Sequence, residues 1–299
     1  MTKQLDYYVK RAVSGLITRR EFVGRAAALG VTAMAANTML ATASRAAPQT
    51  GGTLKIGVQG GATTDSMDPA LAANQTPLLV GRMWGEPLVE LTDDGGIQGK
   101  VAESFESSAD AKTWRFKIRQ GITFSNGQPV TAEDAKATIE RHSGEDTKSG
   151  ALGLLRDIAT LSTEGDTLVI GLKSGNADLP YFMADYHLLI QPGGGKDDPT
   201  AAIGTGPYIM QEIDMGVRFV CSKNPNYWGD LGYAETIEII VINDNTARVA
   251  ALQSGQVDII DRVPPRTAGL VRRAPGVAEP SPAGPGHYVF IMHTDTAPF

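Results

Sequence analysis

The four histidines are the first residues to consider for catalytic or metal-binding chemistry. They are scattered along the chain, at His142, His187, His287 and His293. Only the last two are close in sequence, and in a strand six positions separate two side chains by roughly 20 Å, too far for one metal ion. The sequence has no His-Glu-x-x-His, no Cys-x-x-Cys and no Gly-x-Ser-x-Gly motif. We therefore expect no catalytic site, no metal ion and no cofactor.

Three further patterns have simpler explanations than chemistry. Gly193-Gly-Gly-Lys196 is not followed by Ser or Thr, so it is predicted to be a flexible loop and not a phosphate-binding loop. Asp65 and Asp68 are close enough to suggest a carboxylate pair, but Asp68 stands beside Pro69 and is predicted to support a turn. Cys221 is the only cysteine, so it cannot form a disulfide within the chain, and we expect an inert buried residue.

The first 46 residues have the three parts of an export signal. The segment before Ala26 is basic, Ala26–Ser44 carries no charge, and small residues just before position 47 offer cleavage sites. Thr18-Arg-Arg-Glu-Phe-Val23 matches the twin-arginine pattern, so Arg19 and Arg20 are predicted to direct the protein to the twin-arginine translocase. The alternative is an uncleaved membrane helix, because the uncharged stretch is close to the shortest length that spans a bilayer.

Charge and composition limit the class of partner. The net charge is −6, and the first 46 residues are mainly basic, so the remaining chain is more acidic still. This acidity argues against nucleic acid or an anionic membrane surface as a partner. A hydrophobic content of 42% with 34 glycines and 17 prolines fits a loop-rich globular protein of one large or two ordinary domains.

The last third of the chain predicts strands of a buried sheet. Gly204 and Gly206 flank a predicted tight turn, after which Pro207 fixes φ and a strand begins at Tyr208. Ile237–Ile242 is nearly all β-branched, as expected of a strand buried on both faces.

Helix signals accompany these strands. Asn245 is the predicted N-cap of a helix over Thr246–Ser254, and Gly255 stands where a C′ glycine belongs, before a short strand over Val257–Ile260. Near the other end, Thr76-Pro77 predicts the start of a helix that runs to about Trp84.

The middle of the chain is predicted to be mostly antiparallel. In Trp114–Arg119 the apolar and charged residues alternate, which indicates a strand with one solvated face. Thr131 begins a capped helix that ends near His142. The other predicted elements are two hairpins, Leu88–Thr92 with Ile97–Lys100 and Ile158–Ser162 with Thr167–Leu172.

In order, the motifs of this chain resemble those of the extracellular solute-binding proteins of family 5, the peptide-, dipeptide- and nickel-binding receptors of ABC importers. The resemblance covers roughly Gly52–Phe299, with Met67 and His293 departing from the residues usual in the family. The matching motifs are Leu54-Lys-Ile-Gly-Val58, Asp65-Ser-Met-Asp-Pro69, Trp84-Gly-Glu-Pro-Leu88, Trp114-Arg-Phe-Lys-Ile-Arg119, Phe124-Ser-Asn-Gly127, Thr131-Ala-Glu-Asp134, Gly204-Thr-Gly-Pro-Tyr208 and Asn224-Pro-Asn-Tyr-Trp-Gly229.

The resemblance implies a mixed α/β fold of the periplasmic binding protein type II class. Residues 47–85 and 204–290 would form the first ligand-binding lobe, and residues 86–203 an inserted, mostly antiparallel subdomain. Residues 1–46 would be the signal peptide. Asp295-Thr-Ala-Pro-Phe299 resembles the start of the family's second lobe, so residues 291–299 are interpreted as its first residues and the chain as a fragment or truncated product.

The resemblance also implies the ligand-binding residues. Asp261 and Arg262 follow a predicted strand, and the carboxyl ends of strands are where open α/β sheets bind ligands. Asp261 would pair with an amine and Arg262 with a carboxylate, or the two would form an ordinary solvated surface pair. The residues predicted to bind ligand are Ala72, Ala73, Asn74, Gln75, Asp261, Arg262 and Tyr288.

The implied function is a monomeric, non-catalytic receptor in the periplasm. It would capture short peptides and deliver them to the permease subunits of an ABC importer. Nickel chelates, sugars or opines are alternative ligands within the family. Alternatives of another class are an exported hydrolase and an inactive single-lobe fragment.

Overall fold

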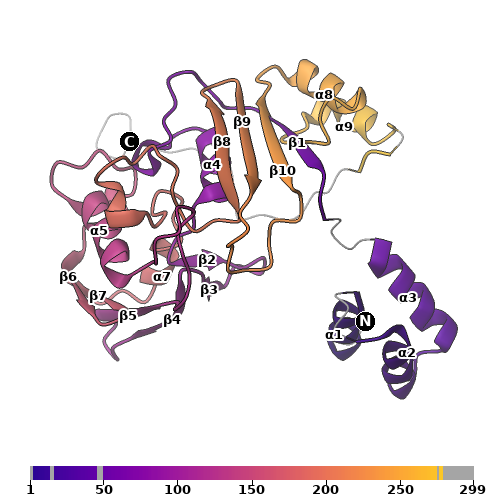
Figure 1. The fold of residues 1–299 in the computed structure, drawn as a ribbon, viewed down its shortest axis with the longest axis horizontal. Coiled ribbons are helices and arrows are strands. Elements are labelled where there is room, and N and C mark those ends of the chain that lie inside the picture. The colour runs from indigo at the N-terminus through magenta and orange to yellow at the C-terminus, as the bar shows by residue number, and fades with distance from the viewer. Residues whose placement is uncertain (1–2, 14–16, 46–49, 275, 279–299) are drawn as a thin grey trace, which may run out of the picture.

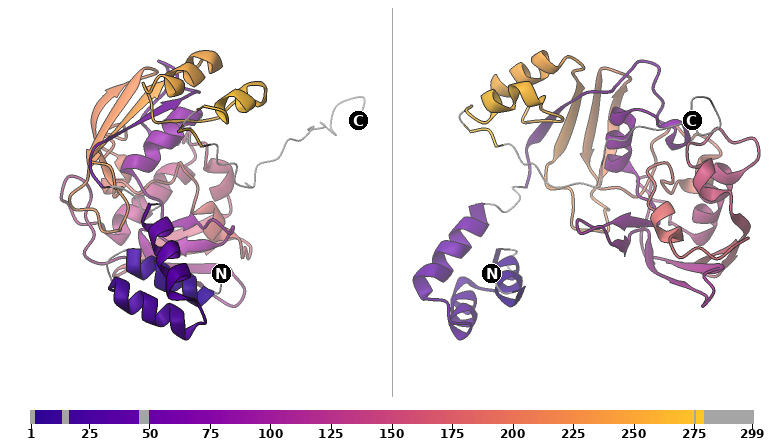
Figure 2. Two further views of the ribbon diagram at one scale, coloured as in Figure 1. Left: turned by 90° about the vertical axis from the view of Figure 1, so that its right-hand side faces the viewer. Right: turned by 180° about the vertical axis from the view of Figure 1, so that it is seen from behind.

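The computed structural model describes residues 3–13, 17–45, 50–274 and 276–278. These residues form three hydrophobic cores: one under a five-stranded sheet, one under a four-stranded sheet and one among three N-terminal helices. The three N-terminal helices lie apart from both sheets, whereas the two sheets lie side by side (Figures 1 and 2).

The five-stranded sheet combines strands from both ends of the described chain. The strand order is β11-β1-β10-β9-β8, in which β1 is parallel to β10 and to β11, and the other pairs are antiparallel. The strands are β1 (Thr53–Val58), β8 (Tyr208–Asp214), β9 (Arg218–Lys223), β10 (Thr236–Val241) and β11 (Ile259–Ile260). Helix α4 (Gln75–Trp84) lies next to β8 in Figure 1, and its Val80 and Trp84 enter the core of this sheet.

Only one face of β10 is fully buried, so the prediction of burial on both faces was wrong. Ile237 and Ile239 are buried. Glu238, on the other face, lies 3.0 Å from the Arg218 guanidinium and 3.8 Å from the Lys55 ammonium. Because Glu238 on this face is only half-buried and makes ion pairs, the strand alternates as strands of partly solvated sheets do.

The four-stranded sheet is antiparallel in the order β4-β5-β7-β6, as predicted for this region. Trp114, Phe116 and Ile118 of β5 point into its core. The strands are β4 (Ala102–Ser107), β5 (Thr113–Ile118), β6 (Ile158–Glu164) and β7 (Thr167–Leu172), with helix α5 (Ala132–Ser143) packed against them. Smaller elements are the hairpin β2 (Val89–Leu91) with β3 (Ile97–Gly99), helices α6 (Leu152–Leu155) and α7 (Leu179–Phe182), and the 3₁₀ turns η1 (Pro69–Leu71) and η2 (Pro192–Gly195).

Two of the predicted helix starts differ from the structure. Helix α8 (Asn245–Gln253) is capped by Asp244, whose carboxylate accepts from the Ala247 N–H, and not by Asn245. Helix α4 begins at Gln75, because the Thr76 hydroxyl donates to the Gln59 carbonyl in place of capping the helix. The capping box of α5, from Thr131 to Asp134, is confirmed, and so is the left-handed Gly255 after α8, with φ +73°.

The N-terminal helices pack on one another around Phe22. They are α1 (Lys3–Val13), α2 (Arg19–Ala28) and α3 (Ala33–Arg45), and Phe22 and Ala26 are fully buried between them. Arg19 and Arg20 lie exposed in the first turn of α2, where Arg19 donates to Asn37. Within the described residues, no helix has the length and apolar character needed to cross a membrane.

A buried carboxylate, Glu86, joins the elements that meet between the two sheets. It is 3% exposed and lies just after α4. Its two oxygens accept from the Thr205 hydroxyl at 3.0 Å, the Tyr227 hydroxyl at 2.8 Å and the Trp228 Nε1–H at 2.9 Å, and the Lys100 ammonium lies at 3.4 Å. Burial beside Glu86 also raises the pKa of Tyr227, so this phenol stays a donor.

Glycines permit the close backbone contacts around this junction. Gly204 and Gly206 lie in a bend and do not have positive φ, so the left-handed conformation is not what requires glycine here. A Cβ on Gly204 would lie 2.5 Å from the Trp84 carbonyl oxygen, and one on Gly206 would lie 2.5 Å from the Met83 carbonyl oxygen. The backbone therefore passes directly over the end of α4, which only glycine allows.

The glycine-rich turn η2 is packed and not the flexible loop that the sequence predicted. Gly193, Gly194 and Gly195 all have positive φ. Gly194 is buried against α5, and a Cβ there would lie 2.4 Å from the backbone carbon of Ala137. The Gly193 N–H donates to Asp134, the residue that also closes the capping box of α5.

Replacement of Glu86 by Ala should lower the free energy of unfolding by about 3 kcal/mol, because buried donors lose their acceptor. Urea unfolding measures this loss. The matched control is Glu164→Ala, which breaks an ion pair with Arg115 whose two side chains are 38% and 57% exposed, and which should cost less than ~1 kcal/mol. Equal losses in the two variants would contradict the central role of Glu86.

Gly194→Ala should cost about 3 kcal/mol or more, because it adds both backbone strain and overlap with α5. The control is Gly165→Ala, at φ +63° with no atom within 4 Å of the added Cβ, which should cost only about 1 kcal/mol. Chemical denaturation of both variants separates the two contributions. A Gly194 variant no less stable than the Gly165 variant would show that η2 is not packed against α5.

Candidate functional site

The carboxyl ends of the parallel strands β1, β10 and β11 meet at one edge of the five-stranded sheet. The loops that follow them are joined by hydrogen bonds. The Gly60 N–H donates to the Asn243 side chain at 2.9 Å, and the Thr76 N–H donates to the Gly60 carbonyl at 3.2 Å. This edge is therefore an ordered surface at the position where open α/β sheets bind ligands.

The two segments predicted to bind ligand meet at this edge. Arg262 is the second residue after β11, following Asp261. Its Nη2 donates to the Gln75 side-chain oxygen at 3.2 Å. Asn74 donates to Asp65 at 2.5 Å. The side chains of Asn74, Gln75 and Arg262 are exposed, as is Ala73.

Two predicted site residues have other surroundings, and a third is not among the described residues. Ala72 is buried, so its side chain does not face solvent. Asp261 is only 24% exposed, and its Oδ1 lies 3.1 Å from the Nε of Arg248. Burial raises the pKa of Asp261, and the Arg248 charge partly offsets that rise. Tyr288 lies outside the described residues.

Arg248 of α8 is the main residue of this edge that the sequence analysis missed. Its side chain is 1% exposed. The signal in the sequence is its spacing: Arg248 stands three positions before Ala251, on the helix face that packs inward. A charged residue on a buried helix face needs partners inside the protein. Its position on that face is therefore a sign, readable in the sequence, that the residue is buried and structurally important.

The loop between β1 and α4 is also fixed from the four-stranded sheet's side. Asp68 caps η1 by accepting from the Ala70 N–H at 2.9 Å, as predicted for a turn. Its other oxygen lies 2.5 Å from the Arg141 guanidinium of α5. The Gly150 N–H donates to the Ala70 carbonyl at 3.0 Å. The loop that carries Ala72–Gln75 is thus held by both halves of the molecule.

A buried histidine supports this contact. His142 is fully buried, and its Nδ1 lies 2.6 Å from the Ser149 hydroxyl, next to Gly150. Its Nε2 has no partner in the described structure. Burial, together with the neighbouring Arg141 charge, lowers the pKa of His142 to about 4. The imidazole is therefore neutral at pH 7 and serves the packing of the 149–150 turn.

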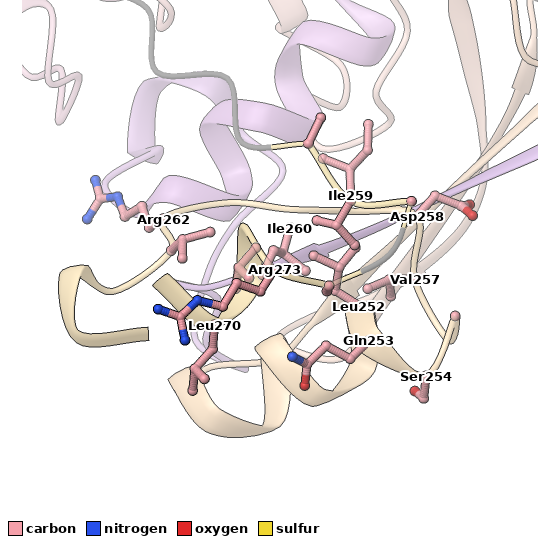
Figure 3. Close-up of a pocket in the computed structure, with 17 residues that line it drawn as sticks. Leu252, Gln253, Ser254, Val257, Asp258, Ile259, Ile260, Arg262, Leu270 and Arg273 are labelled. Atoms are coloured by element: carbon pink, nitrogen blue, oxygen red, sulfur yellow. The ribbon is translucent and has the colours of Figure 1, made fainter. Parts of the chain in front are cut away.

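A cavity of about 1120 Å³ lies on the other side of β11, between α8 and α9 (Pro265–Val271). Much of its wall is apolar, including Val257, Ile260, Leu270 and Val271. Figure 3 shows that Arg262, at its rim, extends away from the other labelled lining residues. The polar edge at Gln75 and Arg262 is the better candidate site, because it lies at the carboxyl ends of the parallel strands.

Metal and thiol chemistry find no support in the described part of the chain. Within it, no three His, Cys, Asp or Glu side chains lie together in a way that would hold a metal ion. Burial raises the pKa of Cys221 to about 12, so its thiol is unreactive at neutral pH, as the sequence predicted.

Comparison with protein families gives one assignment. Residues 96–299 match the model of the bacterial extracellular solute-binding proteins, family 5 Middle. Among curated proteins, the nickel-binding periplasmic protein of Escherichia coli K12 is 34% identical over 186 residues, which cover 58% of this chain and 35% of that protein. The probable D,D-dipeptide-binding periplasmic protein of the same organism is 27% identical over 68% of this chain and 42% of its own length.

Solved structures show the same fold. The periplasmic binding protein AgaA from A. tumefaciens R10, in complex with agropinic acid, has a TM-score of 0.70 and 29% identity, covering 75% of this chain and 46% of AgaA. The DppA protein of Helicobacter pylori, in complex with the peptide STSA, has a TM-score of 0.68 and 20% identity, covering 76% and 50%. These neighbours confirm the mixed α/β, type II periplasmic-binding-protein fold. The chain spans half or less of each of these four relatives.

Acid should destabilise the protein through His142. A pKa of about 4 in the folded state and ~6.5 in the unfolded state means that the unfolded state binds more protons below pH 6.5. Stability is therefore lost as pH falls from 6.5 towards 4, by about 2 kcal/mol between pH 7 and pH 5. The groups that face the imidazole are Arg141, Asp68, His187 and Asp185.

Urea unfolding at pH 7 and pH 5, for the wild type and for His142→Gln, measures this contribution. The variant keeps a polar side chain that does not titrate, so the loss between the two pH values should shrink by about 2 kcal/mol. The same pH dependence in both proteins would contradict the assignment.

Proposed function

Because this chain belongs to the bacterial extracellular solute-binding proteins of family 5, we propose that it captures a small solute outside the cytoplasmic membrane and delivers it to the permease of an ABC importer. The observation that carries the proposal is the meeting of Gln75 and Arg262 at the carboxyl edge of the parallel strands. A receptor of this kind binds its ligand without catalysis.

We propose short peptides as the ligand class. A peptide offers a terminal carboxylate to an exposed guanidinium and main-chain groups to the sheet edge, a combination that tolerates varied side chains. Nickel chelates, sugars and opines are the alternatives within the family. Relatives are named for nickel, for a D,D-dipeptide and for agropinic acid, so the family's ligands differ widely.

The proposed location is the periplasm, reached through the twin-arginine pathway with removal of residues 1–46. Curated relatives are named as periplasmic proteins, which supports the compartment. The pattern around Arg19 and Arg20 supports the route. We further propose that the receptor works as a monomer, with residues 47–85 and 204–290 as the ligand-binding lobe and residues 86–203 inserted into it.

Arg262→Ala should weaken binding by about 10- to 100-fold, because a charge-assisted hydrogen bond to the ligand is lost. Calorimetry with di-, tri- and tetrapeptides, the nickel–histidine complex and agropinic acid measures the affinities and also selects among the ligand classes. The matched control is Arg266→Ala, an exposed arginine on α9 that should leave binding unchanged. Unchanged affinity in the Arg262 variant would remove this residue from the site.

A further inference from the structure

Arg248 donates hydrogen bonds to the loops that follow β1, β10 and β11, at the edge of the sheet where the candidate site lies. Its Nη1 donates to the Ile242 carbonyl, after β10, at 2.8 Å. Its Nη2 reaches the Gln59 side chain, after β1, at 3.1 Å, and the Asn245 side chain at 2.7 Å. Its Nε faces the loop after β11, where Asp261 supplies both a carbonyl at 3.2 Å and a carboxylate oxygen at 3.1 Å. One buried guanidinium therefore fixes the relative positions of three strand ends.

The first consequence concerns Asp261. Its Oδ1 is occupied by Arg248 and by the Gln59 N–H at 3.2 Å. Its Oδ2 is buried and accepts no hydrogen bond in the described structure. The Arg248 charge partly offsets the burial of this carboxylate, and a ligand ammonium has no access to the buried Oδ2. The pairing of Asp261 with an amine, expected from the sequence, does not fit this geometry.

The second consequence concerns the backbone at Arg262. Its φ of +45° lies in the left-handed region, which non-glycine residues seldom adopt. The carbonyls of Asp261 and Arg262 both accept from Arg248, at 3.2 Å each. In an extended chain consecutive carbonyls point in opposite directions, so two that converge on one guanidinium require a helical conformation between them. Arg248 thereby holds Arg262 in a strained conformation.

We propose that Arg248 is a positioning residue that withdraws the Asp261 carboxylate and presents the Arg262 guanidinium, so that this edge selects ligands by an anionic group, a carboxylate. The inference rests on the proposed function and specifies its ligand. The two nearby acids already have partners within the protein. Asp65 accepts hydrogen bonds from the Asn74 amide and the Ala62 N–H, and Asp244 caps α8.

The binding test compares trialanine with its C-terminal amide, two probes that differ only in the charge of one end. Calorimetry should show that the wild type prefers the acid by about tenfold or more, and that Arg262→Gln abolishes the preference. Arg248→Met should abolish it as well, although this residue does not touch the ligand. A purely structural role of Arg248 would instead weaken both probes equally and keep the ratio, and that result would overturn the inference.

A thermal test detects the positioning without any ligand. In the wild-type background, Arg262→Gly should melt about 3 °C higher than Arg262→Ala, because glycine adopts positive φ without strain. With Arg248 replaced by Met the residue can relax, so the difference between Gly and Ala should vanish. Arg248→Lys keeps the charge but cannot bridge the two carbonyls. In this second background, too, the difference in melting temperature between Arg262→Gly and Arg262→Ala should vanish. An unchanged Gly–Ala difference in these backgrounds would refute the role of Arg248.

The outcomes separate the inference from the proposed function. Equal affinity of the wild type for the acid and the amide would overturn the selectivity and leave the receptor function standing. No binding of either probe would overturn the peptide assignment itself. The melting comparison would then decide whether Arg248 sets the conformation of Arg262.

Discussion

The carboxylate of Glu86 is the interaction on which the two sheets depend. A buried charge is costly unless it is fully partnered, and Glu86 obtains its partners from segments far apart in sequence: Lys100, Thr205, Tyr227 and Trp228. Those segments can supply them only if α4 ends beneath the 204–206 backbone, which requires glycines there. Three motifs that look separate in the sequence, around residues 86, 205 and 228, are therefore parts of one buried network.

The elements of the fold were largely predictable, because they depend on local patterns. Alternation identified β5, and the capping box identified α5. Prediction failed where a residue type fits two structural roles and only tertiary contacts determine which of them it has. Thr76 bonds a neighbouring loop and does not cap its helix, while Gly194 serves a close contact and not mobility. Neither choice leaves a mark within a few residues of sequence.

The candidate site was predictable in location more than in chemistry. The resemblance pointed to Gln75 and Arg262 as two separate ligand-binding positions, and the structure joins their side chains by a hydrogen bond at the strand ends. The pairing of Arg248 with Asp261 was not predictable, because the helix pattern marks Arg248 as a buried charge but does not say which acceptors it meets. Whether a charge is available to a ligand depends on how completely the protein already satisfies it, and that depends on packing across three strands.

The contacts of Asp68 and Ala70 with Arg141 and Gly150 have a consequence for how such proteins are recombined. The loop that contains Asp68 and Ala70 is held both by the five-stranded sheet and by the part of the chain around α5, so it belongs to neither part alone. If the 86–203 segment were exchanged with that of a relative, the chimaera would inherit one half of each contact, and the 65–75 loop would lose its alignment with the sheet edge. The loop would therefore have to be transplanted together with the end of α5 and the turn at Gly150 that hold it.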